Sequence, residues 1–457
     1  MGIKATGSDV PLPLVSFSAL VAKGLSKASR ATVLRTLDGL VFKEPTPIQM
    51  QAVPSLLAGR DVVACAPTGS GKTLAFVLPL VVAMRADMDA KSGASAAPVA
   101  PRVLVLSPTR ELAAQTARAA ASYAAGLGIK VTMLRKSNLL GDGDKAADGG
   151  GRARRRLPLV HLLVATPLLL MQAVTEHGAS LASVRHLVLD EADRLFEMGF
   201  LDQVDAILEQ CNLDDLQRAM FSATMPPQVA ELAATVLRDP VSITVGVNGA
   251  GASTVKQRLL FVGREEGKLV AIRQMVAEGI KPPVLLFVQS KERAKELYSE
   301  LAYDGVNVEV MHSDRSHAQR DDIIRRLRRG DVWILITTDV LARGVDFKGV
   351  QTVINYDFPM SMINYVHRIG RTGRAGRTGE AITFYTETDF PMLRSLANVM
   401  KLSGSEVPEW MLGLKALPRS RRKELERIAP KRHRISTVSK FDRRKAAHKR
   451  KVVADSK

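Results

Sequence analysis

The segment DVVACAPTGSGKT (residues 61–73) joins a short apolar run to a glycine-rich loop that ends in lysine and threonine. This ending matches the P-loop pattern G-x-G-K-[ST], although Ala66 replaces the first glycine of the full pattern. Such glycines let the backbone wrap a triphosphate, the lysine reaches the β- and γ-phosphates, and the threonine offers a hydroxyl to Mg²⁺. We therefore expect ATP to bind here; a glycine-rich turn without nucleotide is the alternative. The expected phosphate-binding residues are Ala66, Pro67, Thr68, Gly69, Ser70, Gly71, Lys72 and Thr73.

Apolar runs similar to DVVACA recur along the chain, with helical stretches between them. They are hydrophobic throughout, as is typical of strands buried on both faces of a parallel sheet. The pattern restarts after about residue 256, so the sequence predicts two successive doubly wound α/β domains. The first set of runs covers 61–66, 102–107, 161–166, 186–190 and 219–224, and the second covers 258–262, 284–289, 307–312, 333–338, 352–356 and 381–386.

Composition shifts suggest where the domains begin and end. The small, flexible stretch GVNGAGAST (246–254) is the predicted linker. Two low-complexity stretches in the first half, 87–101 and 141–156, are interpreted as surface loop insertions, and the second carries four arginines. The predicted division is an N-terminal extension (1–16), a first domain (17–246), a linker (247–256), a second domain (257–412) and a basic tail without fixed structure (413–457).

Much of the positive charge is concentrated at the C-terminal end. The chain of 457 residues carries a formal net charge of +19. From Lys415 to Lys457 there are 17 Lys and Arg against 4 Asp and Glu, a net of +13, which leaves +6 for residues 1–414. Such a tail indicates a polyanionic partner or a nuclear import signal, and a solvated, disordered end is the alternative.

The rest of the composition is that of a soluble globular protein. The longest nearly apolar run (161–174) is too short to cross a bilayer, and we expect no secretory signal at the N-terminus. The two cysteines, Cys65 and Cys211, cannot form a disulfide framework, which fits a reducing compartment.

The run HLVL ends in Asp190, Glu191, Ala192 and Asp193, so three acids follow one predicted strand. In P-loop proteins an acid at the end of a neighbouring strand holds Mg²⁺ beside the phosphates, and we assign Asp190 to that role, partly through water. The adjacent Glu191 can orient or deprotonate a water for attack on the γ-phosphate. A calcium site is the alternative, but three acids lack its ligand count and loop spacing.

The tetrad at 190–193 spells D-E-A-D, and from about residue 17 to residue 412 the chain resembles the DEAD-box RNA helicases. This resemblance implies two tandem RecA-like parallel-sheet domains, the core of superfamily 2 helicases. VFKEPTPIQ (41–49) resembles the adenine-reading motif, in which Gln49 would hydrogen-bond adenine and Phe42 would stack on it, with Thr46 alongside. The same resemblance implies Lys72, Thr73, Asp190 and Glu191 as catalytic residues, with ATP and Mg²⁺ as cofactors.

The resemblance also implies RNA-binding and coupling residues. SPTREL (107–112) is similar to the family's first RNA-backbone motif, SAT (222–224) to its coupling motif, and HRIGRTGR (367–374) to its sixth motif. The implied RNA-binding residues are Thr109, Arg110, Thr166, Gln289, Thr338 and Arg343. The implied coupling residues are Asp193, Ser222, Thr224 and His367; Asp346 would contact the ATP ribose, and Arg371 and Arg374 would be arginine fingers that act on domain closure.

Three features depart from the family pattern. Leu169 in TPLLL (166–170) stands where an arginine is usual, which predicts a weaker grip on RNA phosphates without loss of function. His317 stands where glutamine is usual, and the insertion at 141–156 replaces or displaces a glycine loop that contacts RNA.

Longer stretches such as 282–301 and 393–411 resemble the Rok-type branch, also called DEAD-box helicase fifty-two, whose members are nucleolar and act in small-subunit ribosome assembly. That branch implies pre-rRNA as the partner, assembly factors as further partners, a nuclear and nucleolar location, and a monomer. The expected function is an RNA-stimulated ATPase that locally unwinds or remodels RNA duplexes or RNA–protein complexes. An ATP-gated RNA clamp or assembly scaffold and a DNA-acting helicase are the alternatives.

Overall fold

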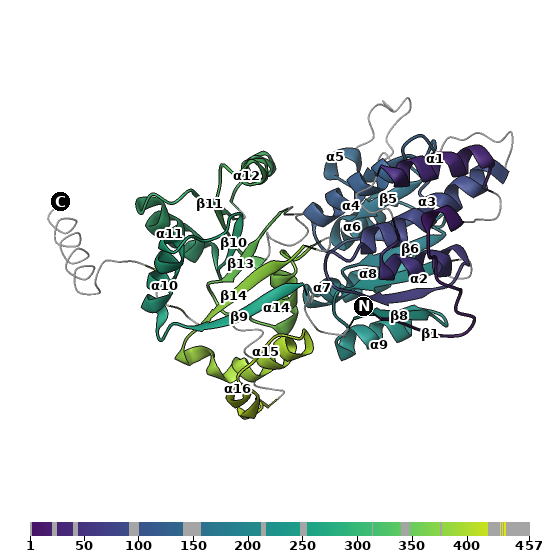
Figure 1. Ribbon diagram of the computed structural model, residues 1–457. Coiled ribbons are helices and arrows are strands. Elements are labelled where there is room, and N and C mark those ends of the chain that lie inside the picture. Colours follow the sequence, from purple (N-terminus) through teal and green to yellow (C-terminus); the bar gives the residue numbers. More distant parts are fainter. Residues whose placement is uncertain are drawn as a thin grey trace. The chain divides into compact units, whose positions relative to one another are not determined.

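The structure is a computed structural model, and the described residues fall into two units, one ending at Gly246 and one beginning at Thr254 (Figure 1). Each unit is a parallel β-sheet covered by helices. The described residues are 2–20, 25–39, 44–90, 100–139, 157–211, 216–246, 254–312, 314–339, 347, 349–374, 377–418, 430, 432, 434 and 435.

The first unit is built on an eight-stranded sheet with the order β1-β8-β2-β7-β6-β3-β5-β4. All neighbouring strands are parallel except β1, which pairs antiparallel with β8. β2 and β6 flank β7 and are both parallel to it, so their carboxyl ends lie at the same edge of the sheet. The strands are β1 (Ile3–Thr6), β2 (Val62–Cys65), β3 (Val103–Leu106), β4 (Val131–Met133), β5 (Leu162–Ala165), β6 (His186–Asp190), β7 (Gln217–Ser222) and β8 (Val241–Val245).

Helices cover both faces of this sheet, and alternate residues of one strand enter different cores. In β3, Val103 and Val105 join the core beneath α1 to α4, whereas Leu104 and Leu106 join the core beneath α6 to α9. This double burial explains why β2, β3 and β5 are apolar at every position. The helices are η1 (Phe17–Ala19), α1 (Lys27–Asp38), α2 (Pro47–Leu57), α3 (Lys72–Ala90), α4 (Arg110–Tyr123), α5 (Lys136–Leu139), α6 (Pro167–His177), α7 (Ala192–Glu197), α8 (Leu201–Glu209) and α9 (Pro227–Val236).

The second unit is built on a six-stranded, fully parallel sheet with the order β11-β12-β10-β13-β14-β9. β10, β12 and β13 are buried at every residue, whereas the edge strand β9 alternates between buried and exposed residues in its first half. The strands are β9 (Val255–Phe261), β10 (Val284–Phe287), β11 (Val308–Met311), β12 (Ile334–Thr337), β13 (Thr352–Asn355) and β14 (Gly379–Tyr385).

One core of the second unit lies between its sheet and helices α10 and α11. Ile435, from the segment predicted to be a basic tail, is buried in this core, so the chain contacts the second unit again beyond α16 (Glu409–Gly413). The helices are α10 (Glu265–Ala277), α11 (Lys291–Tyr303), α12 (His317–Arg329), α14 (Met362–Ile369), η2 (Glu387–Asp389), α15 (Phe390–Leu402) and α16 (Glu409–Gly413).

The prediction of two doubly wound α/β domains is confirmed, and each of the eleven predicted apolar runs overlaps a strand. The sequence reasoning missed β1, β4 and β8, which are short or alternate between buried and half-buried residues. β1 belongs to the segment interpreted as an N-terminal extension and adds a strand to the first sheet. Among the described residues, no helix is long and apolar enough to cross a membrane.

Candidate functional site

The glycine-rich loop leaves β2 at the carboxyl edge of the first sheet and leads into α3, which begins at Lys72. Gly69 and Gly71 have φ angles of 81° and 91°, in the left-handed region that favours glycine. A Cβ on Gly71 would also overlap the side-chain amide of Gln49. The backbone conformation therefore favours glycine at both positions, and at Gly71 the close approach of the Gln49 side chain does so as well.

The polar groups of this loop are arranged as in a phosphate site. Lys72 Nζ donates to the carbonyl oxygens of Ala66 (2.5 Å) and Pro67 (3.1 Å). Burial lowers the pKa of Lys72, while the nearby carboxylates, Asp193 first, oppose that shift. Thr68 Oγ1 and Ser70 Oγ are buried without a hydrogen-bond partner in the described part of the chain. An ammonium group and two unsatisfied hydroxyls are suitable donors for phosphate oxygens.

The predicted adenine-reading residues Thr46 and Gln49 lie against this loop. Thr46 is the N-cap of α2, and its Oγ1 donates to Ser70 O at 2.7 Å. Gln49 Nε2 donates to Gly71 O at 3.1 Å, and Gln49 Oε1 accepts from the Thr46 backbone N–H at 3.0 Å. The structure therefore brings these two residues to the phosphate loop, whereas Phe42 lies outside the described residues.

The acids Asp190 and Glu191 lie at the carboxyl end of β6. Asp190 is 3% exposed, and it accepts hydrogen bonds from the Glu191 backbone N–H (3.0 Å) and Thr116 Oγ1 (3.5 Å). Burial and the neighbouring Glu191 raise the pKa of Asp190 to about 7, against the opposing effect of Lys72. A buried carboxylate in this state gains strongly from a cation.

Glu191 is held in a strained conformation. Its φ of 49° and ψ of 55° lie in the left-handed region, which a glutamate seldom occupies. Its Oε2 is buried without a hydrogen-bond partner among the described residues. A strained residue with an unsatisfied carboxylate oxygen is suited to hold a proton or a water for chemistry rather than to stabilise the fold.

The predicted magnesium ligands Asp190 and Thr73 fit a cation that takes one or two protein oxygens and completes its shell with water and phosphate. Within the described ranges, no group of three or more His, Cys, Asp or Glu residues could hold a metal by itself. Asp190 fits Mg²⁺ here because its carboxyl is 3% exposed and has a second acid next to it in the chain; this environment raises its pKa, and a bound cation would keep the carboxyl deprotonated.

The third acid, Asp193, joins the acid cluster to the end of β7. Its Oδ2 accepts hydrogen bonds from Thr224 Oγ1 (2.6 Å) and the Thr224 backbone N–H (3.0 Å). The Asp193 backbone N–H donates to Ser222 Oγ (3.2 Å), and that hydroxyl donates to Thr224 O (2.7 Å). The predicted coupling residues Asp193, Ser222 and Thr224 therefore form one buried network.

The predicted RNA-binding residues of the first unit lie where helices begin. Thr109 is the N-cap of α4, and its hydroxyl accepts from the Leu112 backbone N–H at 3.3 Å; the next residue, Arg110, is exposed. Thr166 is the N-cap of α6 without a side-chain cap. Leu169, which replaces the usual arginine, is partly buried against the core beneath α6 to α9. At this position the chain therefore has a side chain that packs against the core.

In the second unit, the predicted residues Gln289 and Thr338 follow β10 and β12 at one edge of the sheet, and both are half-buried. His367, in α14, and Arg371, just beyond it, are buried, and Arg374 Nε donates to Gly370 O at 2.8 Å.

The sequence reasoning missed a pair that fixes α14, Arg368 and Asp339. Arg368 is 2% exposed and forms a two-pronged ion pair with Asp339, at 2.6 and 2.8 Å. Arg368 Nη1 also donates to Asp357 O at 2.8 Å. The sequence carried no local signal for this pair, because the two residues lie 29 positions apart in the chain. Thr116, which contacts Asp190, carried no signal in the sequence.

Several predicted features lie outside the described residues: Phe42, Arg343, Asp346 and the insertion 141–156. His317, which stands where glutamine is usual in the family, is the first residue of α12.

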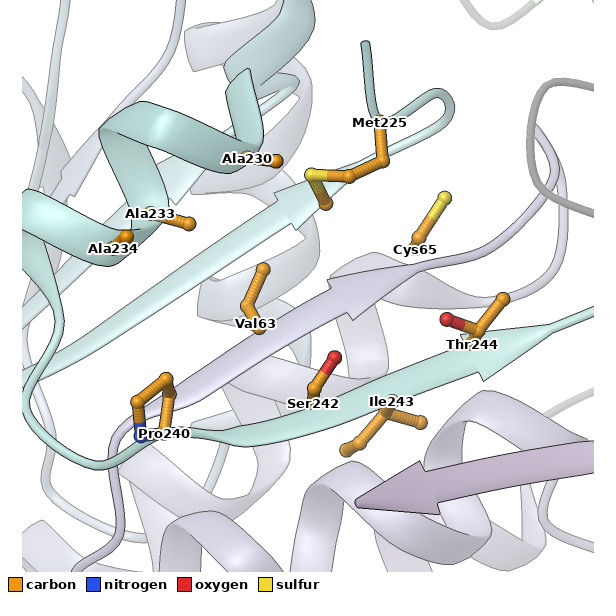
Figure 2. A pocket seen from close by; sticks show the side chains of 10 residues that line it. All are labelled: Val63, Cys65, Met225, Ala230, Ala233, Ala234, Pro240, Ser242, Ile243 and Thr244. Atoms are coloured by element: carbon orange, nitrogen blue, oxygen red, sulfur yellow. The ribbon is translucent and has the colours of Figure 1, made fainter. Parts of the chain in front are cut away.

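A cavity of about 250 Å³ lies beside the first sheet, and Figure 2 shows the side chains that line it. It is lined from β2, β8, α9 and the segments that flank them, by Val63, Cys65, Met225, Ala230, Ala233, Ala234, Pro240, Ser242, Ile243 and Thr244. None of these residues belongs to the predicted ATP or RNA sites. The burial of Cys65 raises the pKa of its thiol to about 11, so it remains protonated and unreactive.

Together, a phosphate loop, an adjoining pair of acids and a second α/β unit define a P-loop nucleotide-hydrolysing protein with two RecA-like units. Comparisons with known proteins agree: the family model "DEAD/DEAH box helicase" matches residues 46–232, and "Helicase conserved C-terminal domain" matches residues 267–376. The chain belongs to the DEAD-box helicase family.

Two relatives illustrate the similarity. DEAD-box ATP-dependent RNA helicase 57 of Oryza sativa subsp. japonica is 47% identical over 92% of this chain and 73% of its own length. ATP-dependent RNA helicase ROK1 of Lodderomyces elongisporus is 43% identical over 99% of this chain and 80% of its own length. Among solved structures, S. cerevisiae Dbp5 bound to RNA and ADP BeF3 is 27% identical, with a TM-score of 0.70, over 91% of this chain and 98% of that one.

Proposed function

We propose that this protein is an ATP-dependent RNA helicase, an RNA-stimulated ATPase that locally separates RNA duplexes or remodels RNA–protein complexes. The observation that carries the proposal is the adjacent buried pair Asp190 and Glu191, at the same sheet edge as the Lys72 loop: Asp190 is 3% exposed, and Glu191 Oε2 is buried without a hydrogen-bond partner among the described residues. The relatives at 43–47% identity, both named ATP-dependent RNA helicases, support the same activity.

In this proposal the residues of the first unit divide the work of hydrolysis. Lys72 gives up its hydrogen bonds to the loop carbonyls and donates to the β- and γ-phosphates instead. Thr46 and Gln49 hold the loop in place through the backbone oxygens of Ser70 and Gly71. Asp190 and Thr73 would hold Mg²⁺, which would neutralise charge on the phosphates. Glu191 orients the attacking water and accepts its proton. Phe42 and Asp346 would contact the base and the ribose.

Arg371 and Arg374 are proposed to stabilise the charge that develops on the γ-phosphate, an effect worth roughly 10³–10⁵ in rate. Asp193, Ser222, Thr224 and His367 are proposed to couple hydrolysis to RNA. The network of Asp193 with Thr224 and Ser222 supports this role. Asp193 Oδ2 accepts two hydrogen bonds from Thr224, so a movement of the acids at 190–193 would also move the segment that follows β7. The proposed RNA contacts are Thr109, Arg110, Thr166, Gln289, Thr338 and Arg343.

We extend the proposal to the biological setting: pre-rRNA as the substrate, rRNA processing and small-subunit assembly as the process, assembly factors as partners, and a nucleolar monomer. The ROK1 relative and the charge of +13 on residues 415–457 support this extension.

The test is ATP turnover by the full chain with no nucleic acid, with single-stranded RNA and with single-stranded DNA of the same sequence. We expect strong stimulation by RNA alone, and strand separation of a short RNA duplex that requires ATP. Tight ATP-dependent RNA binding without turnover or strand separation would instead identify an RNA clamp. Equal stimulation by DNA would contradict RNA as the substrate class.

A further inference from the structure

Residues 430, 432, 434 and 435, here called the C-terminal segment, lie against the second unit, and two of them contact Gln289, one of the residues predicted to bind RNA. Gln289 follows β10, and its backbone N–H donates to Asp357 Oδ2 at 2.9 Å. Its side-chain Nε2 donates to Pro430 O at 3.0 Å, and its Oε1 accepts from Arg432 Nε at 3.0 Å. Both ends of the amide are thus held by a segment 141 to 143 residues further along the chain.

Arg432 is anchored far more firmly than an arginine of a solvated tail. Its side chain is 4% exposed, and Nη1 and Nη2 donate to Glu265 (2.6 Å) and Asp389 (2.9 Å). Its Nε lies 3.7 Å from Asp357. A guanidinium presents its donors in a rigid, planar fork, so these acids fix the direction in which Nε points at Gln289.

The charges around Arg432 balance only when it is present. Among the described residues, one cluster of ion pairs joins three acids to three bases, and each member has a charged nitrogen or oxygen within 4 Å of an opposite charge. The acids are Glu265, Asp357 and Asp389, and the bases are Lys268, Arg293 and Arg432. Removing Arg432 would leave one buried negative charge in excess.

The segment has a second anchor beyond Arg432. Ile435 is buried in the core formed with α10 and α11, and its backbone N–H donates to Glu296 Oε2 at 3.0 Å. Arg434 lies between the two anchors but is 84% exposed, with Glu296 3.7 Å away. Docking therefore rests on Arg432 and Ile435, and Arg434 is a neighbour with little part in it.

We propose that Pro430 and Arg432 are positioning residues for RNA binding: they hold the Gln289 amide in one orientation, in which its remaining Nε2 hydrogen donates to an RNA phosphate oxygen. This inference rests on the proposed function. An amide that is held at both ends gives up less conformational freedom on binding, so the contact is stronger than one from a freely rotating side chain.

The test uses full-length variants and measures RNA affinity by fluorescence anisotropy and the RNA concentration for half-maximal ATP turnover. Arg432→Lys keeps the positive charge but loses the fork. We expect it to retain most of the thermal stability and the maximal rate, while both RNA parameters weaken about 3- to 10-fold, the range for one hydrogen bond. Gln289→Ala should weaken them equally, and the double variant should be no weaker than either single variant. Arg434→Ala, the matched control, should behave as the unaltered protein does.

Three outcomes would overturn the inference. Unchanged RNA affinity in Arg432→Lys, beside a normal response of the unaltered protein to RNA, would leave the segment a structural element only. Tighter RNA binding or faster RNA-free turnover would mean that the segment blocks Gln289 instead of positioning it. Additive losses in the double variant would show that Arg432 acts independently of Gln289. An unaltered protein that neither binds RNA nor responds to it would contradict the proposed function itself.

Discussion

Each unit of the protein buries an aspartate near the carboxyl end of a parallel strand, and the surroundings shift the pKa values of the two aspartates in opposite directions. Asp190, the last residue of β6, has a second acid beside it, and burial with Glu191 raises its pKa to about 7. Asp357, two residues beyond β13, is fully buried too, but Lys268 and Arg293 hold its pKa well below the usual range despite that burial.

The opposite pKa shifts distinguish a buried carboxylate that stabilises the fold through ion pairs from one that is suited to bind a cation. Around Asp357 the protein supplies its own cations, at 2.7 Å (Arg293) and 3.0 Å (Lys268). Around Asp190 the compensation by Lys72 does not offset burial, so a bound cation would lower the free energy of the site. Perturbed carboxylates of the second kind gather at functional sites, whereas a neutralised cluster is a structural feature.

The largest effect is expected from Glu191→Gln, which removes the proposed base while the side chain keeps its shape. ATP turnover should fall about 10²- to 10⁴-fold, the usual contribution of a general base, and ATP affinity should be retained. The melting temperature should not fall, because Oε2 of Glu191 forms no hydrogen bond in the described part of the chain that could be lost. Turnover close to that of the unaltered protein would remove Glu191 from the chemistry.

The next effect is expected in the second unit. Asp357→Asn should lower the free energy of unfolding by about 3–5 kcal/mol, because it leaves buried cations without their common partner. Chemical denaturation at pH 7 measures this. The contribution of Asp357 is present above the ordinary carboxyl pKa and is lost only as pH falls toward the lower folded value, so the gap between the two proteins should be nearly constant from pH 5 to 8. A gap below 1 kcal/mol would mean that the cluster tolerates one missing charge.

Asp190→Asn should raise the free energy of unfolding, whereas Asp357→Asn lowers it, and the size of the increase should depend on pH. Between the ordinary carboxyl pKa of 3.8 and the folded value of about 7, the folded protein binds more protons than the unfolded chain, so stability falls as pH rises. The substitution removes that loss. Without nucleotide and Mg²⁺, the variant should be more stable than the unaltered protein by up to a few kcal/mol at pH 8, and by little at pH 4. Thermal unfolding across this pH range, in chelator, tests both the sign and the window.

The smallest effect is expected from Asp314→Asn in the second unit. Asp314 pairs with Lys291 and Lys295, but all three side chains are between 44% and 52% exposed. Exposed ion pairs contribute little, since water screens the charges and the long side chains lose freedom on pairing. No measurable change in melting temperature is expected, which makes this variant the surface control for Asp357→Asn. A fall as large as that of Asp357→Asn would show that burial is not what distinguishes the two.

Most of the fold could be predicted from the sequence because the parallel strands are buried on both faces and appear as unbroken apolar runs. The strands that escaped, such as β8 with its pattern VSITV, alternate and are only partly buried. The positions of the glycine-rich loop after β2 and of the acids at the end of β6 could also be predicted, because each motif is a run of adjacent residues; their roles in binding ATP and Mg²⁺ stay predictions.

Contacts between distant residues that belong to no sequence motif were not predictable. Nothing in the local sequence of Arg432 distinguishes it from Arg434, two positions later, yet one is 4% exposed and the other 84%. The same holds for Thr116, which reaches Asp190 across 74 residues. Composition alone therefore presented residues 413–457 as a uniform basic tail, whereas the structure uses particular members of it as anchors.

The central claim, that the acids of the first unit are kept for a cation bound with nucleotide, is tested most directly by thermal unfolding with ATP, in Mg²⁺ and in chelator. The account predicts that Mg²⁺ adds to the stabilisation by ATP in the unaltered protein and in Asp314→Asn, and that this increment disappears in Asp190→Asn. The same Mg²⁺-dependent increment in Asp190→Asn would contradict the account, because the cation would then be held without the one buried carboxylate assigned to it.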